Sequence, residues 1–161
     1  TLLVNRGRQY LKNSDISGSV DFIFGNAPAV FDNSIIHSLR AGYVTAASTE
    51  ENQPGFVFTQ CRLTTEAGLT GKVDLGRPWC PYAHVTFLKT YMDDHIKPGG
   101  WNNWGKESNE QTARFGEYDN FGPGAESSGR VPWAKQLTAD EANQYTVEAV
   151  LSGTDHWDWR L

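Results

Sequence analysis

A short pattern of apolar and polar positions occurs four times in the first hundred residues. Each copy has an apolar residue, two variable residues, a small residue, one variable residue and an aliphatic residue. The small positions are Ser14, Ser34, Cys61 and Thr90. A pattern that recurs at roughly 20 to 30 residues, with extra length between copies, is typical of a solenoid whose rungs stack and whose insertions form loops.

The segments around these copies favour strands. Ser19–Phe24, Gly55–Phe58 and His84–Leu88 carry β-branched and aromatic residues and are bounded by Gly, Pro and Asn. Each unit is too short for a pair of helices. The pattern therefore predicts an all-β fold, a parallel β-helix, and leaves open similar strands in a β-sandwich.

The residue composition changes after Met92. Pro98–Gly105 and Asn120–Ala125 are rich in turn residues and carry aromatics, which is typical of long loops. Thr138–Glu141 then forms a capping box, and the spacing beyond it predicts one C-terminal helix from about Ala139 to Leu151, within residues 138–152. We expect this helix to cap the solenoid or to lie as a strap along its side.

Length and charge limit the classes of function. The 161 residues suit one domain, which would bury roughly 68 to 70% of its unfolded surface. The formal net charge of -5 gives no electrostatic reason to bind nucleic acid or an anionic membrane surface. Neither a run of eighteen apolar residues nor a secretion signal in the first ten residues is present, so an export signal would lie outside this chain. We expect a monomer.

Asp21 is the first candidate for chemistry, because it lies inside the apolar segment Val20–Gly25. A carboxylate there needs a partner, and a nearby guanidinium favours its ionised form. Gly76–Trp79 offers Arg77, preceded by a glycine that would permit a tight turn and followed by Trp79, whose face suits a sugar ring. The alternative is an ion pair that only orders two rungs.

Other titratable residues predict less. Asp93 and Asp94 invite a glycosidase interpretation, but adjacent strand residues point to opposite faces, which favours a solvated turn. The four histidines lack ligand spacing. Cys61 and Cys80 allow one disulfide at most and no metal knuckle.

Two segments closely resemble, in order and spacing, the signatures of pectin methylesterases: Gly18–Asn26 and Leu75–Trp79. Further resemblance runs through Arg8–Tyr10, Gly55–Cys61, Tyr91–Trp101 and Gly116–Ala125. The loop after Met92 is more similar to the bacterial branch. The resemblance implies a right-handed parallel β-helix with long loops. It also implies a secreted or periplasmic enzyme that removes methyl groups, as methanol, from the C6 esters of pectin (methyl-esterified homogalacturonan).

The resemblance also assigns roles to residues. Asp21 matches the nucleophile that forms a covalent acyl-enzyme, Arg77 matches the arginine that holds this carboxylate and contacts substrate, and Trp79 matches the tryptophan that packs against the sugar. No metal or organic cofactor is implied. By physical analogy we expect Phe24 to line the same cleft. Three further aromatics are expected as walls on the long loops: Trp101, Trp104 and Tyr118.

One departure from the family lies at the front of the chain. The family has Gln-Asp-Thr-Leu one rung before the nucleophile, with the Asp as general acid and base and the Gln as oxyanion donor, whereas this sequence starts at Thr1-Leu2. We therefore expect residues 1–161 to be part of a catalytic domain without its first rungs, and inactive alone. The alternative is a natural, non-catalytic remnant that binds pectin. A lyase or polygalacturonase fits less well, because no calcium-binding carboxylate cluster is evident.

Overall fold

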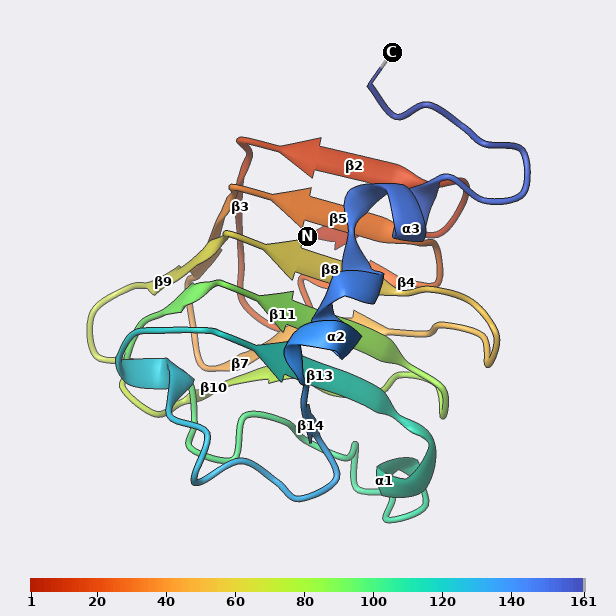
Figure 1. The fold of residues 1–161 in the computed structure, drawn as a ribbon. Coiled ribbons are helices and arrows are strands. Elements are labelled where there is room, and N and C mark those ends of the chain that lie inside the picture. Colours follow the sequence, from red (N-terminus) through yellow and green to blue (C-terminus); the bar gives the residue numbers. More distant parts are fainter. Residues whose placement is uncertain (161) are drawn as a thin grey trace.

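The chain winds through three parallel sheets, and successive turns place their strands side by side in the same sheet (Figure 1). The computed structural model describes residues 1–160. The first sheet contains β1 (Leu2–Leu3), β4 (Ile23–Gly25), β7 (Gly42–Ala47) and β10 (Val73–Gly76). The second contains β2 (Gln9–Lys12), β5 (Ala29–Asp32), β8 (Phe56–Thr59), β11 (His84–Leu88), β13 (Arg114–Tyr118) and β14 (Lys135–Gln136). The third contains β3 (Asp15–Gly18), β6 (Ile35–Ser38), β9 (Arg62–Thr65) and β12 (Tyr91–Met92).

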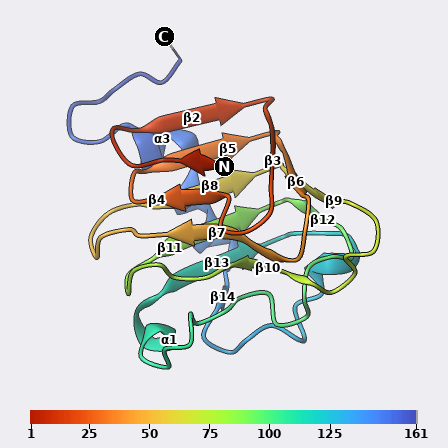
Figure 2. The same cartoon turned by 180° about the vertical axis from the view of Figure 1, so that it is seen from behind.

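The predicted parallel β-helix is confirmed. Neighbouring strands come from successive rungs and pair in parallel, for example Phe31 with Phe58 and Phe58 with Phe87. Figure 2 shows the molecule from behind, where the first sheet faces the reader and the second sheet lies on the opposite side. The sandwich alternative is wrong, because a sandwich is built from antiparallel sheets.

The four-fold sequence pattern marks the turn between the second and third sheets. The residue before each small residue has a left-handed backbone: Asn13, Asn33, Gln60 and Lys89, with φ between 47° and 54°. The small side chains then bond to the neighbouring rung, since the Ser14 N–H donates to Ser34 Oγ at 3.1 Å and the Cys61 N–H donates to Thr90 Oγ1 at 3.3 Å. Small size at this position lets the rungs stack closely.

A fifth turn of the same kind escapes the pattern. Asp119 has φ 51°, and the Thr90 N–H donates to Oδ1 of the next residue, Asn120, at 2.9 Å. The Asn120 amide therefore takes the place that Ser, Cys and Thr occupy in the other rungs. Because asparagine is larger than Ser, Cys or Thr, this turn does not carry the small-residue pattern of the other four.

Aromatic side chains stack through the core. The rings of Phe31 and Phe58 are parallel with centroids 4.4 Å apart, and those of Phe58 and Phe87 follow at 4.5 Å. On the next strand, Glu117 pairs with Phe87 and so occupies the position that a further ring of this stack would take. Its carboxylate is buried and accepts a hydrogen bond from Arg130 Nε at 2.9 Å and one from Trp101 Nε1 at 3.1 Å. A buried ion pair thus replaces the aromatic stack at this end of the solenoid.

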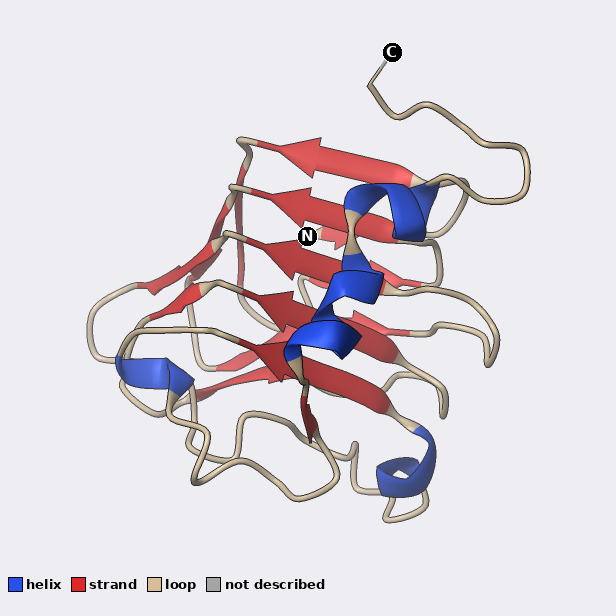
Figure 3. Ribbon diagram, in the orientation of Figure 1, coloured by secondary structure: helices blue, strands red, loops and turns tan. Residues whose placement is uncertain are grey.

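The C-terminal segment lies across the outer face of the second sheet (Figure 3). The predicted capping box is present, with Thr138 and Glu141 each bonding the other's backbone N–H. The prediction of one continuous helix is wrong: α2 (Ala139–Ala142), η2 (Asn143–Tyr145) and α3 (Val147–Leu151) are separate. Thr146 has an extended backbone and its hydroxyl caps α3, which interrupts the helical hydrogen bonding.

The expected strap is present, because this segment packs its apolar side chains on the sheet. Val150 and Leu151 are buried against Val30, Val57 and Leu88. The remaining short helices lie in the loops: α1 (Asn109–Thr112) and η1 (Pro123–Ala125). Within residues 1–160, no helix is long and apolar enough to cross a membrane.

Candidate active site

Asp21 and Arg77 form a two-point ion pair on the outer side of the first sheet. Arg77 Nε donates to Asp21 Oδ1 at 3.1 Å, and Nη2 donates to Oδ2 at 2.7 Å. Asp21 lies in the turn just before β4, with φ 52°, and not inside a strand as the apolar segment predicts. Aspartate tolerates this left-handed backbone better than most residues. The Asp21 N–H donates to the Tyr43 carbonyl oxygen at 2.8 Å, which fixes the turn to the next rung.

The Arg77 guanidinium lies between two aromatic rings. Its central carbon is 3.9 Å from the ring centroid of Tyr43 and 3.8 Å from that of Trp104. The hydrogen bonds to Asp21, opposed by partial burial, raise the pKa of Arg77 above its ordinary value. Two rings and a carboxylate therefore hold a charged guanidinium in one plane and one orientation.

Trp104 reaches this place through an unusual backbone. Its φ is 61°, a conformation that is rare for a bulky residue, and its N–H donates to Asn102 Oδ1 at 2.8 Å. Such strained positions concentrate at functional sites. Trp104 was expected from the sequence as a wall residue, but Tyr43 was not. The only sequence signal for Tyr43 is its distance of 22 residues from Asp21, about one rung, which places it on the next strand of the first sheet.

Gly76 lets β10 approach β7 closely. A Cβ at this position would lie 2.0 Å from Thr45 Oγ1, and the Arg77 N–H donates to the Thr45 carbonyl oxygen at 3.0 Å. The predicted tight turn at Gly76 is wrong, because Gly76 is the last residue of β10 and its φ is not positive. The Trp79 N–H continues the pairing, at 3.0 Å from the Ala47 carbonyl oxygen.

A cleft of about 290 Å³ opens beside the ion pair. Its lining residues are Thr1, Val20, Asp21, Phe24, Ala46, Trp79 and Trp104. Trp79 is 51% exposed, and its ring centroid lies 5.9 Å from that of Phe24. Two neighbouring aromatic rings and a carboxylate thus line the same cleft. Among residues 1–160, Asp21 is the only acidic side chain that lines this cleft.

The structure separates two other expected wall residues from the cleft. Trp101 is 3% exposed and stacks on Phe115 at 4.2 Å, so it belongs to the core. Its bridge to Gly76 continues the first sheet and turns the indole inward. Tyr118 lies at the end of β13 and lines a groove on the second sheet. The position of an aromatic residue near a long loop therefore did not predict whether its side chain packs in the core or lines the cleft.

A second charged pair lies next to the first. Lys97 Nζ donates to Asp74 Oδ2 at 2.6 Å, and Nζ is 5.8 Å from the Tyr43 ring centroid. Burial raises the pKa of Asp74, and the hydrogen bond from Lys97 opposes that shift. Tyr43 therefore contacts both Arg77 and Lys97. Asp74 carries the same sequence signal as Asp21, a carboxylate within an apolar segment.

The remaining candidates lie outside the cleft. Asp93 and Asp94 lie in a turn after β12, as the alternative to a glycosidase pair predicts, and Thr70 Oγ1 donates to Asp94 Oδ2 at 2.9 Å. Cys61 and Cys80 are both free thiols. Within residues 1–160, no group of three or more His, Cys, Asp or Glu side chains is placed to hold a metal ion.

The fold and site together define a class: parallel β-helix proteins that hold a surface carboxylate against a guanidinium in an aromatic cleft. The family model for pectinesterase matches residues 1–154. The chain therefore belongs to the pectinesterase family, and its β-helix is right-handed like those of the family's solved members.

Individual relatives agree with this assignment. Pectinesterase 31 of Arabidopsis thaliana is 44% identical over 161 residues, which cover 99% of this chain and 50% of that protein. The pectin methylesterase from carrot has a TM-score of 0.86 and 35% identity, over 94% of this chain and 52% of that one. A pectin methylesterase variant in complex with a hexasaccharide has a TM-score of 0.82 and 35% identity, over 96% and 53%.

The chain spans about half the length of the relatives and solved structures that it matches. The likeness of the loop after Met92 to the bacterial branch stays a prediction.

Proposed function

We propose that this chain supplies the nucleophile and the sugar platform of a pectin methylesterase. The single observation that carries the proposal is the Asp21 carboxylate, held at two points by Arg77 and opening into a cleft beside Trp79. Membership of the pectinesterase family supports it, and so does the likeness to a pectin methylesterase that binds a hexasaccharide. The substrate is methyl-esterified polygalacturonate.

The proposed chemistry begins at Asp21. One carboxylate oxygen attacks the carbonyl carbon of the C6 methyl ester, the bond to the methoxy oxygen breaks, and methanol leaves after that oxygen takes up a proton. Water then hydrolyses the resulting acyl anhydride and restores the carboxylate. Arg77 orients the attacking carboxylate, while the adjoining rings of Trp79 and Phe24 line the cleft as an apolar surface on which the sugar packs.

The proton for methanol needs a donor that the described cleft lining lacks. Asp21 is its only acidic group, and Asp21 is the attacking group in this scheme. We therefore expect residues 1–161 alone to release no methanol from methyl-esterified pectin. The same observation favours a second candidate, a module that binds pectin without hydrolysing it.

We propose that the protein acts outside the cytoplasm, secreted or periplasmic, because pectin is a wall polysaccharide. We also propose that it acts as a monomer.

The two candidates separate in a hybrid enzyme. Residues 1–154 would replace the matching half of the carrot pectin methylesterase, and methanol release from methyl-esterified oligogalacturonate would be measured. The esterase proposal expects turnover by the hybrid, and Asp21→Asn should lower kcat by about a thousandfold or more. Asparagine keeps the size and one acceptor oxygen but is not a nucleophile.

A matched control is Asp119→Asn, an exposed turn aspartate on another part of the solenoid, which should leave turnover unchanged. Undiminished turnover by the Asp21→Asn hybrid would refute the assigned nucleophile. Methanol release by the 161-residue chain alone would refute the expected inactivity.

A further inference from the structure

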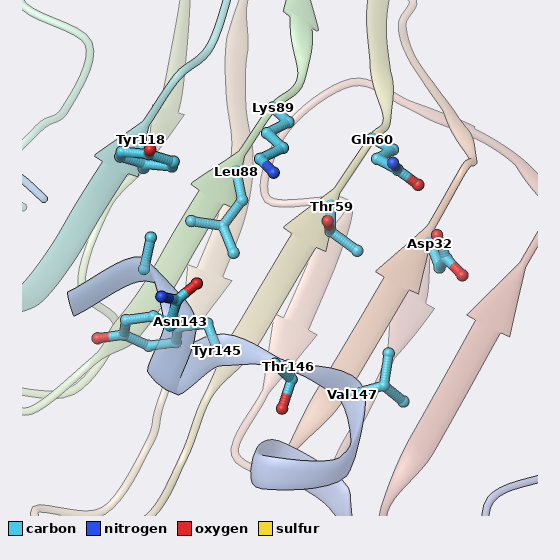
Figure 4. Close-up of a pocket in the computed structure, with 11 residues that line it drawn as sticks. Asp32, Thr59, Gln60, Leu88, Lys89, Tyr118, Asn143, Tyr145, Thr146 and Val147 are labelled. Carbon is cyan, nitrogen blue, oxygen red and sulfur yellow. The ribbon is translucent and has the colours of Figure 1, made fainter. Parts of the chain in front are cut away.

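A groove lies between the second sheet and the C-terminal strap (Figure 4). The strap covers the second sheet, on the opposite side of the molecule from the first sheet and the Asp21 cleft (Figures 1 and 2). Its volume is about 360 Å³, within the roughly 300 to 1,000 Å³ that is usual for small-molecule sites. It is lined by Asp32, Thr59, Gln60, Leu88, Lys89, Tyr118, Ala142, Asn143, Tyr145, Thr146 and Val147.

The fold places one wall of the groove in register. Asp32, Thr59, Leu88 and Tyr118 are the last residues of β5, β8, β11 and β13, and they pair side by side across the sheet. Phe31, Phe58 and Phe87 point into the core, so the residues after them point outward. The left-handed turn residues Gln60 and Lys89 extend this wall by one position each (Figure 4).

The strap supplies the facing wall. Asn143 and Thr146 lie at the joints between α2, η2 and α3, where the helix is interrupted and polar side chains are exposed (Figure 4). Val147 packs in the apolar cluster that holds the strap to the sheet. The groove thus offers hydroxyl, amide and ammonium groups above an apolar floor, a combination that suits the hydroxyls and the ring carbons of a sugar.

The charges in the groove differ from end to end. At one end, Asp32 accepts a hydrogen bond from the Tyr10 hydroxyl at 2.6 Å and pairs with Lys12 at 3.5 Å, so its charge is already compensated. Towards the other end, the exposed Lys89 has no carboxylate of residues 1–160 within ion-pair distance, and this includes its neighbour Asp119. The uncompensated charge of the groove is therefore positive, in a chain of net charge -5.

We propose that this groove is a second saccharide site, which binds de-esterified galacturonate units through their carboxylates. Lys89 pairs with the carboxylate, while Gln60, Thr59 and Asn143 bond to hydroxyls. The proposal rests on the proposed function, because the ligand is the product of ester hydrolysis. The two faces then differ in preference: the cleft takes the neutral methyl ester, and the groove takes the acid that the reaction leaves behind.

The test is a titration of the 161-residue chain with unmethylated trigalacturonate, followed by backbone amide NMR. Resonances of Gln60, Lys89 and Asn143 should shift in one saturable process. Lys89→Gln should weaken this process about fivefold, as expected for a solvent-exposed charge pair. The matched control is Lys72→Gln, another exposed lysine, whose ammonium bonds only to the Gly68 carbonyl oxygen of its own loop; it should leave the affinity unchanged.

Two further ligands and one cleft variant complete the test. Fully methyl-esterified trigalacturonate and an uncharged trisaccharide should shift the groove resonances at least fivefold more weakly than the acid. Trp79→Ala should leave the groove titration intact while it weakens shifts around Asp21. Absence of groove shifts with the acid, or equal affinity in Lys89→Gln, overturns the second site. Methanol release by the hybrid enzyme is measured separately, so failure of either proposal is recognised independently.

Discussion

Arg77 donates two hydrogen bonds to Asp21 although 56 residues separate them in the sequence. The rings of Tyr43 and Trp104 pack against the guanidinium and hold its plane in the orientation that allows both hydrogen bonds. Asp21 lies in the turn before β4 and Arg77 directly follows β10, and these two strands lie two positions apart in one sheet. The geometry of the candidate nucleophile is thus set by four residues from four different rungs or loops.

Replacing Arg77 by lysine tests this geometry. An ammonium keeps the charge but cannot donate twice in one plane or fill the space between two rings, so Arg77→Lys in the hybrid enzyme should lower kcat/KM at least about tenfold. The control is Arg62→Lys, which alters a similar contact with Tyr91, 4.5 Å away on the third sheet, and should have no effect on turnover. Equal rates for Arg77→Lys and the parent would show that charge alone suffices.

The pair between Glu117 and Arg130 should govern stability. Their side chains are 4% and 3% exposed, so Arg130→Met would leave a buried carboxylate without its counter-charge. We expect a loss of about 3 to 5 kcal/mol in the free energy of unfolding, measured by urea denaturation. Adding Glu117→Gln, which keeps an acceptor for Trp101, should recover a large part of it.

The matched control for this measurement is Arg160→Met. Arg160 pairs with Asp158 on the surface, where solvent screens the pair, so its removal should change the free energy of unfolding far less than Arg130→Met does. A loss below about 1 kcal/mol for Arg130→Met would contradict the prediction.

His84 should make stability depend on pH. Burial, together with the nearby Arg114 charge, lowers the pKa of His84 from 6.5 to about 4. Between these values the unfolded chain binds the proton and the folded chain does not, so stability falls as pH falls from about 6.5 to 4. The full loss from this group is about 3 kcal/mol.

His84→Gln should flatten this part of the pH profile, measured by urea denaturation at several pH values. Exposed His156→Gln is the control and should keep the parent slope. An unchanged slope in His84→Gln would rule out His84 as the source.

The two free thiols should react at different rates. Burial raises the pKa of Cys61 to about 11, and its Sγ lies 3.3 Å from the Phe31 carbonyl oxygen. Cys80 is only half-buried, beside Trp79. Brief alkylation of the native protein should label Cys80, and Cys61 should follow at least about a hundredfold more slowly, as judged by mass spectrometry of peptides. In urea both should react alike; rapid native labelling of Cys61 would contradict its burial.

Some of the site was predictable because its signals are local. A carboxylate inside an apolar segment marked Asp21, and the same signal was available for Asp74 but not used. Aromatic composition was a poorer guide, since Trp101 and Trp104 are three residues apart in one loop, yet one is core and the other contacts Arg77. Which way each indole points depends on the rung it meets, and no local pattern records that.

The sequence by itself determined the repeating turn, the strand-rich rungs and hence the parallel β-helix. These follow from the size, polarity and backbone preference of single positions such as Asn33 and Ser34. Only the tertiary structure decided which loops meet at the Arg77 guanidinium, where the strap breaks at Thr146 and how the groove beside Lys89 is lined. Those features arise between rungs that are 20 to 30 residues apart, because their relative positions depend on the length of every insertion between them.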